Sequence, residues 1–89
     1  MEIQYRQAFL KDLKHLKSSS IYQRIYNLAF TTLPALNTLQ EIPNLKAMRG
    51  YTSRYRIRLG DYRVGIEVKE NTIEVMRVLH RREFYRYFP

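Results

Sequence analysis

The feature that most constrains the fold is a stretch in which cationic and apolar residues alternate, Arg54-Tyr55-Arg56-Ile57-Arg58-Leu59, followed by Gly60-Asp61. Alternation with a period of two is typical of a β-strand that has one buried face. Gly60-Asp61 predicts a two-residue hairpin turn, because glycine tolerates the positive φ that such turns require. Residues 62–69 are then expected to return as the partner strand.

A two-residue turn also predicts which residues face each other across this hairpin. The expected pairs are Leu59 with Tyr62, Arg58 with Arg63, Ile57 with Val64, Arg56 with Gly65, and Arg54 with Glu67. Arg54 opposite Glu67 is a favourable pair, whereas like charges facing each other, as in Arg58 and Arg63, destabilise a sheet. Neighbouring guanidinium groups, with Gly65 leaving space beside Arg56, therefore predict a face that holds an anion.

Apolar periodicity predicts two helices in the N-terminal half, after a short opening strand at residues 3–5. The first helix is expected from Gln7 to about Lys17. Ser20 and Gln23 read as a capping box that opens the second helix, which Pro34 ends near Leu33. Because the connection is short, the two helices are expected to form an antiparallel hairpin.

Strand patterns dominate the C-terminal half, after an irregular loop over residues 34–45. Strands are expected at residues 46–49, 53–59, 62–69 and 72–79. A turn at Glu70-Asn71 pairs Val68 with Ile73, and an unbroken register then places Met76 beside Gly65 and Val78 beside Arg63. The predicted fold is α+β: an antiparallel helix hairpin packed on one face of a curved, mainly antiparallel sheet of four to five strands, with a short C-terminal helical turn. The opposite face of the sheet is cationic.

The composition limits the function. The chain has 89 residues, a net charge of +8 and a pI near 10.1, which predicts one domain with a polyanionic partner such as RNA, DNA, anionic lipid or an acidic protein. It contains no cysteine and only two histidines, so we expect neither a disulfide nor a metal cofactor. No apolar run is long enough for a membrane span, and a cytoplasmic location is the default expectation.

Candidate site residues gather on the cationic strands and at the C-terminal turn. Arg81 and Tyr85 are spaced i,i+4 and share a face if a helical turn begins at Arg81. Guanidinium groups bind phosphate, and an aromatic ring stacks on an unpaired base, which together is the chemistry of single-stranded RNA recognition. The residues proposed to bind RNA or phosphate are Lys46, Arg54, Arg56, Arg58, Arg63 and Arg82.

Two alternatives to these assignments remain open. A row of arginines on a strand is more often a solvated face than a site. His80 ends the last strand and is expected on the arginine face, roughly opposite Asp61. There it would serve either as a hydrogen-bond partner of the turn or as a catalytic group.

The chain resembles the RelE/ParE superfamily of toxins from bacterial and archaeal toxin–antitoxin systems. The resemblance covers nearly the whole chain. It is carried in order by Phe9 to Leu16, Leu45 to Gly50, Tyr55-Arg56-Ile57-Arg58-Leu59-Gly60-Asp61-Tyr62-Arg63, and His80-Arg81-Arg82-Glu83-Phe84-Tyr85. Each segment alone is weakly diagnostic, but their order and spacing together are specific.

The resemblance implies an mRNA interferase, a metal-independent endoribonuclease that cleaves mRNA in the ribosomal A site and is silenced by a cognate acidic antitoxin in a heteromeric complex. It implies that Arg56 and Arg58 hold phosphate and assist the 2′-hydroxyl, and that Arg63 steadies the scissile phosphate. It also implies that Arg81 lies near the leaving oxygen and that Tyr85 stacks on a base. Some members carry lysines at the positions of Arg56 and Arg58. Arginine keeps its proton in proteins, so the general base is unidentified and His80, the tyrosines and Lys46 are candidates.

Two other functions fit the same resemblance. One is a ParE-like toxin that inhibits DNA gyrase and cleaves no RNA. The other is a basic relative that binds nucleic acid without catalysis.

Overall fold

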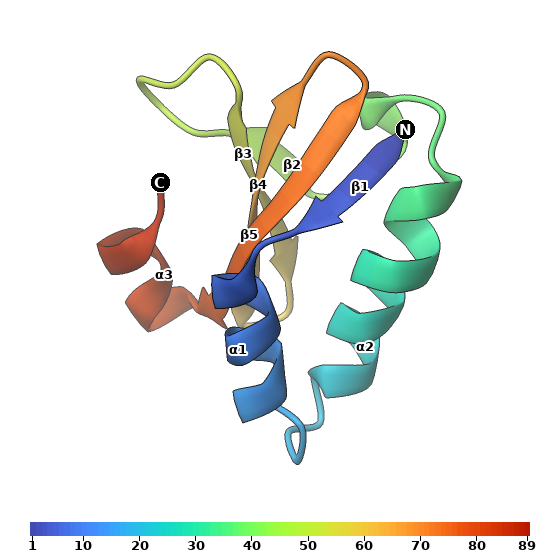
Figure 1. Cartoon of the computed structure of the whole chain (residues 1–89). Helices are drawn as coiled ribbons and strands as arrows, with labels where there is room; N and C mark the ends of the chain where they lie inside the picture. Colours follow the sequence, from blue (N-terminus) through green and yellow to red (C-terminus); the bar gives the residue numbers. More distant parts are fainter.

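The computed structural model describes all 89 residues. The fold is one mixed five-stranded sheet with helices on both faces (Figure 1). The helices are α1 (Gln7–His15), α2 (Tyr22–Asn27) and α3 (Arg81–Tyr87), and the strands are β1 (Glu2–Tyr5), β2 (Leu45–Ala47), β3 (Arg54–Leu59), β4 (Tyr62–Lys69) and β5 (Thr72–His80). The strand order is β1-β5-β4-β3-β2. β1 runs parallel to β5 and every other pair is antiparallel, so the predicted fold class is confirmed.

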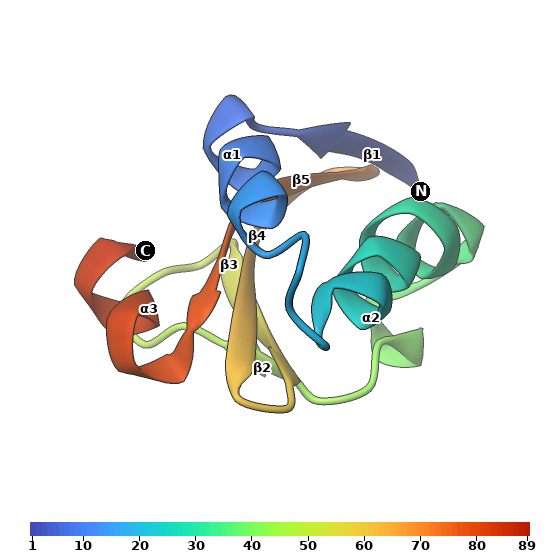
Figure 2. The ribbon, with the colours of Figure 1, turned by 90° about the horizontal axis from the view of Figure 1, so that it is seen from below.

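The main core lies between the sheet and the two N-terminal helices, which cover one face, whereas α3 lies on the other face (Figures 1 and 2). Phe9 of α1, Ile25 of α2 and Ile66 of β4 are fully buried in it. Burying such side chains contributes about 1.5–3 kcal/mol each, which is what holds a small domain together. None of the helices is both long and apolar enough to cross a membrane.

The second helical segment differs from its prediction at both ends. The structure contradicts the Ser20 capping box: the residue preceding α2 is Ile21, and its N–H donates to Ser19 Oγ at 3.3 Å. The segment continues beyond α2 as a π-helical turn (Leu28–Thr32) and a 3₁₀ turn (Leu33–Ala35). Pro34 lies in the first turn of this 3₁₀ segment, where its missing N–H removes no helical hydrogen bond.

The hairpin of β3 and β4 has the predicted register, including all five cross-strand pairs. The turn between them places Gly60 at φ +60°, the left-handed conformation that favours glycine. The pairing of Val68 with Ile73 across the next turn is also confirmed. The two short turns therefore align β3 with β4 and the first part of β5 with β4.

The predicted register of β5 is correct as far as Val75 and wrong after it, because the strand contains a β-bulge. Ile66 pairs with Val75 but Gly65 pairs with Arg77, so one extra residue is inserted at Met76. Val78 consequently pairs with Val64 and is buried in the main core, not beside Arg63 as predicted. A bulge changes the side-chain parity of the rest of the strand, and hydrophobic alternation alone does not reveal it.

A partly buried ion pair holds the bulged strand against α1. Asp12 accepts hydrogen bonds from Arg77 Nε at 2.7 Å, from Arg77 Nη2 at 3.0 Å and from the backbone N–H of Val78 at 3.1 Å. The hydrogen bond to Asp12 raises the pKa of Arg77. This carboxylate therefore satisfies a backbone donor that the irregular strand leaves available.

The other face of the sheet carries a small second core. Phe84 and Phe88 from the C-terminal segment bury Met76, with Met48 and Leu79 at the edge of the cluster. Phe88 covers Gly65, where a Cβ atom would lie only 2.7 Å from the phenyl ring. Gly65 thus makes room for an aromatic side chain, which corrects the expectation that it leaves space for an anion beside Arg56.

Candidate nucleic-acid interface

A cationic groove runs along the outer strands of the sheet, on the face that α3 partly covers. Its larger hollow has a volume of ≈ 540 Å³ and is lined by Lys46, Ala47, Met48, Arg49, Arg56 and Tyr85. A neighbouring hollow of ≈ 270 Å³ is lined by Asn44, Leu45, Lys46, Arg56 and Arg58. The two hollows share Lys46 and Arg56, so we treat them together as one groove that extends from Asn44 to Tyr85.

Pairing of β2 with β3 places the groove residues on one face. Lys46 lies directly opposite Arg56, so their side chains project from the same side of the sheet. Asn44 precedes β2 with φ +62°, a conformation that asparagine tolerates better than most residues. Its carbonyl oxygen accepts a hydrogen bond from Arg56 Nη1 at 3.2 Å, and its Oδ1 accepts one from Arg58 Nη2 at 3.5 Å. Asn44 therefore orients both guanidinium groups.

The groove has positive charges without counter-charges. No carboxylate lines either hollow. Lys46, Arg49, Arg56 and Arg58 take part in none of the ion pairs of the protein, which involve other residues. Unpaired guanidinium and ammonium groups that converge on a concave surface are suited to bind phosphate.

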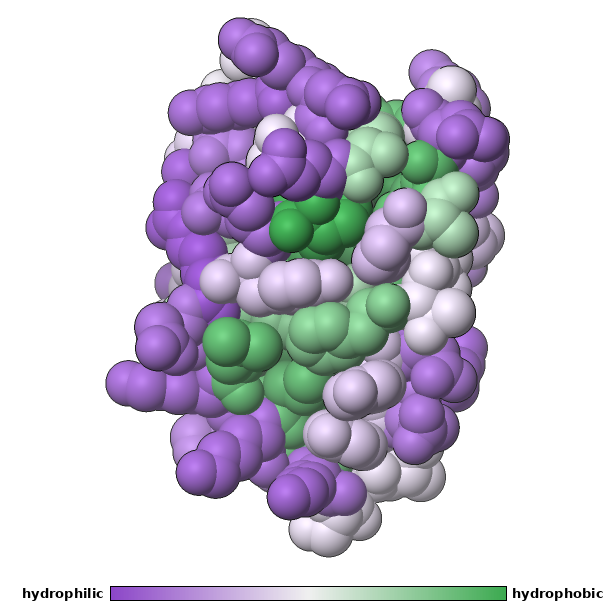
Figure 3. Space-filling model, turned by 45° about the vertical axis from the view of Figure 1, so that its right-hand side comes forward, coloured by the Kyte–Doolittle hydropathy of each residue, from purple (hydrophilic) through white to green (hydrophobic).

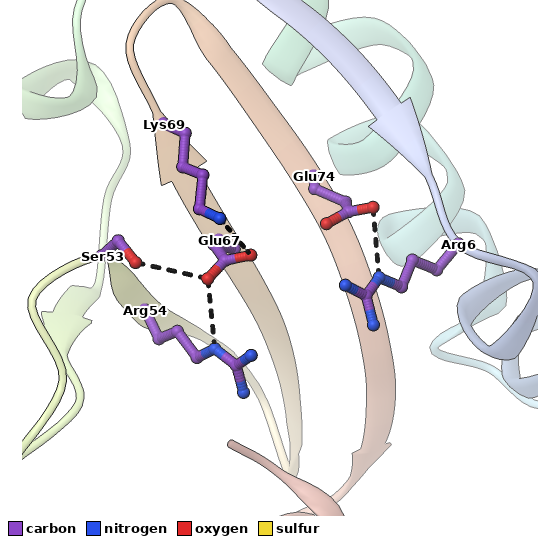
Figure 4. Close-up of polar contacts among 6 residues, drawn as sticks. All are labelled: Arg6, Ser53, Arg54, Glu67, Lys69 and Glu74. Atoms are coloured by element: carbon purple, nitrogen blue, oxygen red, sulfur yellow. Dashed lines mark hydrogen bonds and ion pairs between the residues drawn. The ribbon is translucent and has the colours of Figure 1, made fainter.

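Arg54 lies on the same face but pairs with a carboxylate outside the groove, and a second ion pair lies beside it (Figure 4). Its Nε is 3.4 Å from Glu67 Oε2, and Arg6 Nε is 3.1 Å from Glu74 Oε2. Burial raises the pKa of Glu67, but hydrogen bonds from Arg54 and Ser53 and the charge of a nearby lysine outweigh burial and lower it overall. The structure thus does not bring Arg54 into the groove.

Arg63 and Arg81 lie at the hairpin turn and do not line the groove. Arg63 Nη1 donates to the backbone oxygens of Gly60 at 2.9 Å and Tyr62 at 3.0 Å. Arg81 Nε is 3.6 Å from Asp61 Oδ1, and the Arg81 N–H donates to the Asp61 carbonyl at 2.7 Å. Although Arg58 and Arg63 are cross-strand partners, their guanidinium groups turn to different acceptors, which relieves the repulsion that the sequence predicted.

The C-terminal helix supplies one further groove residue. α3 begins at Arg81, as predicted, and Tyr85 is one turn later, more than half exposed and directed to the groove. Its ring packs edge-to-face on the buried ring of Phe84 at 5.0 Å between centroids. Arg82 is exposed and lines neither hollow.

His80 is not on the arginine face, and the predicted position is wrong because of the bulge. It pairs with Tyr62 and shares the parity of Val78, which faces the main core. Its ring packs edge-to-face on that of Tyr62, with 5.3 Å between the ring centroids. Its Nδ1 accepts a hydrogen bond from the N–H of Arg82 at 3.2 Å. His80 therefore caps the N-terminus of α3.

We expect His80→Ala to affect stability more than chemistry. Loss of the cap should lower the free energy of unfolding by about 0.5–2 kcal/mol, whereas His80→Asn keeps a side-chain acceptor and should lose less. Urea denaturation of both variants checks this expectation. If folded His80→Ala instead lost roughly 10²–10⁴-fold in RNA cleavage, the imidazole would be a general acid or base after all.

Sequence reasoning missed five of the nine residues that line the groove, namely Asn44, Leu45, Ala47, Met48 and Arg49. Asn44 had a detectable signal, because Pro-Asn before a strand predicts a turn with a positive φ. Met48 and Arg49 were expected inside a strand over residues 46–49, but that strand is β2 (Leu45–Ala47) and ends before them.

Comparisons with known proteins identify the family. The profile described as "ParE toxin of type II toxin-antitoxin system, parDE" matches residues 3–85. The chain is 42% identical over 90 residues to Toxin RelE3 of Methanocaldococcus jannaschii, and the alignment covers 100% of both chains. It belongs to the RelE/ParE superfamily of type II toxins.

Solved structures agree with this assignment. The toxin superposes on a chain of the RelB–RelE antitoxin–toxin complex from Methanococcus jannaschii with a TM-score of 0.79 and 42% identity, covering 97% of this chain and 99% of that one. A chain of the DinJ–YafQ complex of Escherichia coli shares only the fold, at a TM-score of 0.74 and 13% identity, with 94% and 97% of the two chains covered. This protein is therefore a toxin of a type II toxin–antitoxin system, related to RelE over its whole length.

Proposed function

We propose that this toxin is a metal-independent endoribonuclease that cleaves mRNA in the ribosomal A site. The observation that carries the proposal is the groove itself. It combines four cations without carboxylate partners and an exposed tyrosine ring at one end. Such a surface binds a single-stranded nucleotide through its phosphate and one face of its base.

In the proposed reaction, the 2′-hydroxyl of the RNA attacks the adjacent phosphorus and displaces the 5′-oxygen of the next nucleotide. Arg56 and Arg58 converge on the groove from one strand, and Asn44 sets their directions. They would neutralise the charge that grows on the non-bridging phosphate oxygens in the transition state. The reaction needs no metal ion, because the nucleophile belongs to the substrate and the enzyme aligns it.

Two further arginines would join this site on substrate binding. Arg63 and Arg81 project near the hairpin turn, at the end of β3 that carries Arg58. Their present partners are two backbone carbonyls and the exposed carboxylate of Asp61, which are weak competitors for a guanidinium group compared with a phosphodiester. We expect Arg63 to turn toward the scissile phosphate and Arg81 toward the leaving oxygen, the roles that the resemblance assigns to them.

The shape of the groove favours a substrate that is held in position by another macromolecule. The groove is a shallow strip on an open sheet, and Tyr85 is more than half exposed. A ribosome that holds the mRNA codon would supply the alignment that the toxin surface does not enclose. We therefore propose that the toxin acts in the cytoplasm, on mRNA that is bound to ribosomal RNA and protein.

An acidic antitoxin is the proposed protein partner. The solved relative is a complex of toxin with antitoxin, and the net charge of +8 favours a negatively charged partner. Apolar side chains form a band across the helical side of the domain (Figure 3). Leu10 of α1 and Tyr26 of α2 are exposed large side chains, and Tyr26 packs on Phe30 at 4.8 Å between ring centroids. We infer that an antitoxin segment covers this band and extends to the groove, with an affinity that falls as salt rises.

Inhibition of DNA gyrase is the second candidate function, because the matching family profile is named for ParE. In that case the groove would have no catalytic task.

Mapping the 5′ ends of cellular mRNAs after induced expression separates the two functions. New ends at defined positions within codons of translated frames are expected for the ribonuclease. DNA-damage signalling without such ends would support gyrase inhibition and contradict the proposal.

A further inference from the structure

The groove contains one lysine among its arginines. Lys46 lines both hollows, with Tyr85 on one side and Arg58 on the other. It is exposed and makes no side-chain hydrogen bond or ion pair. A nucleotide whose base stacks on Tyr85 and whose phosphate lies at Arg56 and Arg58 therefore has its connecting bonds next to Lys46.

The reaction needs a proton transfer, and the arginines of this site are poor proton donors. The departing 5′-oxygen needs a proton, and a guanidinium group does not release one in proteins. The only other groups in the groove with a transferable proton are Lys46 and Tyr85. His80 is on the opposite parity of β5, with its Nδ1 engaged in capping α3.

We propose that Lys46 is the general acid of the reaction. This inference rests on the ribonuclease function proposed above. As the bond between the 2′-oxygen and phosphorus forms, the bond between phosphorus and the 5′-oxygen breaks, and Lys46 Nζ gives a proton to that oxygen. The proton of the 2′-hydroxyl passes to a water molecule in the open groove, and solvent returns a proton to Lys46. The products are a 2′,3′-cyclic phosphate and a 5′-hydroxyl.

Tyr85 is a weaker candidate for the same role. Stacking on a base uses the face of its ring, and its position on α3 places it at one end of the groove. Lys46 is on β2, directly opposite Arg56, where the phosphate is expected.

The test uses Lys46→Arg, which keeps the positive charge but removes the transferable proton. Programmed ribosomes would carry either an ordinary mRNA or one whose scissile 5′-oxygen is replaced by sulfur. A thiolate leaves without protonation, so the sulfur substrate does not need the acid. On ordinary mRNA we expect Lys46→Arg to be slower than wild type by about 10²–10⁴-fold. On the sulfur substrate its rate should return close to that of wild type.

The alternatives give different results. If Lys46 only binds phosphate, Lys46→Arg cleaves ordinary mRNA at nearly the wild-type rate. If it is needed for the geometry of the groove, the variant is slow on both substrates. Either result overturns the inference, whereas failure of wild-type toxin to cleave either mRNA would refute the ribonuclease function itself. Lys69→Arg is the matched control, because Lys69 is an exposed lysine of the same sheet that lies outside the groove.

Discussion

Arg56→Ala is expected to lower the rate of mRNA cleavage by about 10²–10³-fold, the usual cost of removing one donor that stabilises a transition state. Arg56 lines both hollows of the groove and has no counter-charge. Its side chain ends at the surface, so truncation leaves no cavity in the core. Single-turnover cleavage on programmed ribosomes, measured beside a thermal melt, would separate the loss of chemistry from a loss of folding.

Lys69→Ala is the control for that experiment, since it removes a positive charge from the same sheet outside the groove. Its cleavage rate should stay near that of wild type. Equal losses in both variants would mean that the toxin uses net charge only, and that the groove is not a site.

Asp12→Ala should lower the free energy of unfolding by about 2–4 kcal/mol, a large effect for a side chain outside the core. Removing one partner of a partly buried pair leaves a guanidinium group and a backbone N–H without their acceptors. Asp12 accepts from both Arg77 and the N–H of Val78, and its side chain is only 11% exposed. Urea denaturation at neutral pH measures this loss.

Asp61→Ala is the comparison for that stability measurement. Its carboxylate is 71% exposed and pairs with Arg81 across 3.6 Å of open surface. Exposed ion pairs contribute roughly 0–1 kcal/mol, so this variant should unfold near the wild-type midpoint. Equal destabilisation of the two variants would contradict this expectation. The contact of Asp12 with β5 would then contribute no more to holding α1 on the sheet than an exposed ion pair does.

Much of the sheet was predictable because the turns define its register. Gly60-Asp61 places the arginines of β3 against β4, and Glu70-Asn71 aligns the next pair of strands. The bulge at Met76 was not predictable from the alternation of β5, and the acceptor of the bulged segment, Asp12, is 65 residues away from Arg77 in the sequence. The remaining residues of β5 changed sides, including His80.

The residue types of the candidate site were predictable from the sequence, but their arrangement was predictable only in part. Register alone brings Arg56 and Arg58 to one face, and the spacing of Arg81 and Tyr85 correctly indicated a final helix. The pairing of Arg54 with Glu67 also follows from the register. The sequence gives no sign that Phe88 covers Gly65, because this contact depends on how side chains pack after the strands have paired.

The most direct test of the ribonuclease function is a single 2′-deoxy substitution in the mRNA, on the 5′ side of the scissile phosphate, in the A site of programmed ribosomes. EDTA would be added with spermidine in place of free divalent ions, so that ribosomes stay intact. The proposed reaction predicts that ordinary mRNA is cleaved to a 2′,3′-cyclic phosphate under these conditions and that the substituted mRNA is not cleaved, because DNA-like sugar lacks the attacking group. Cleavage of the substituted mRNA at the normal rate would contradict attack by the 2′-hydroxyl and with it the function proposed for this groove.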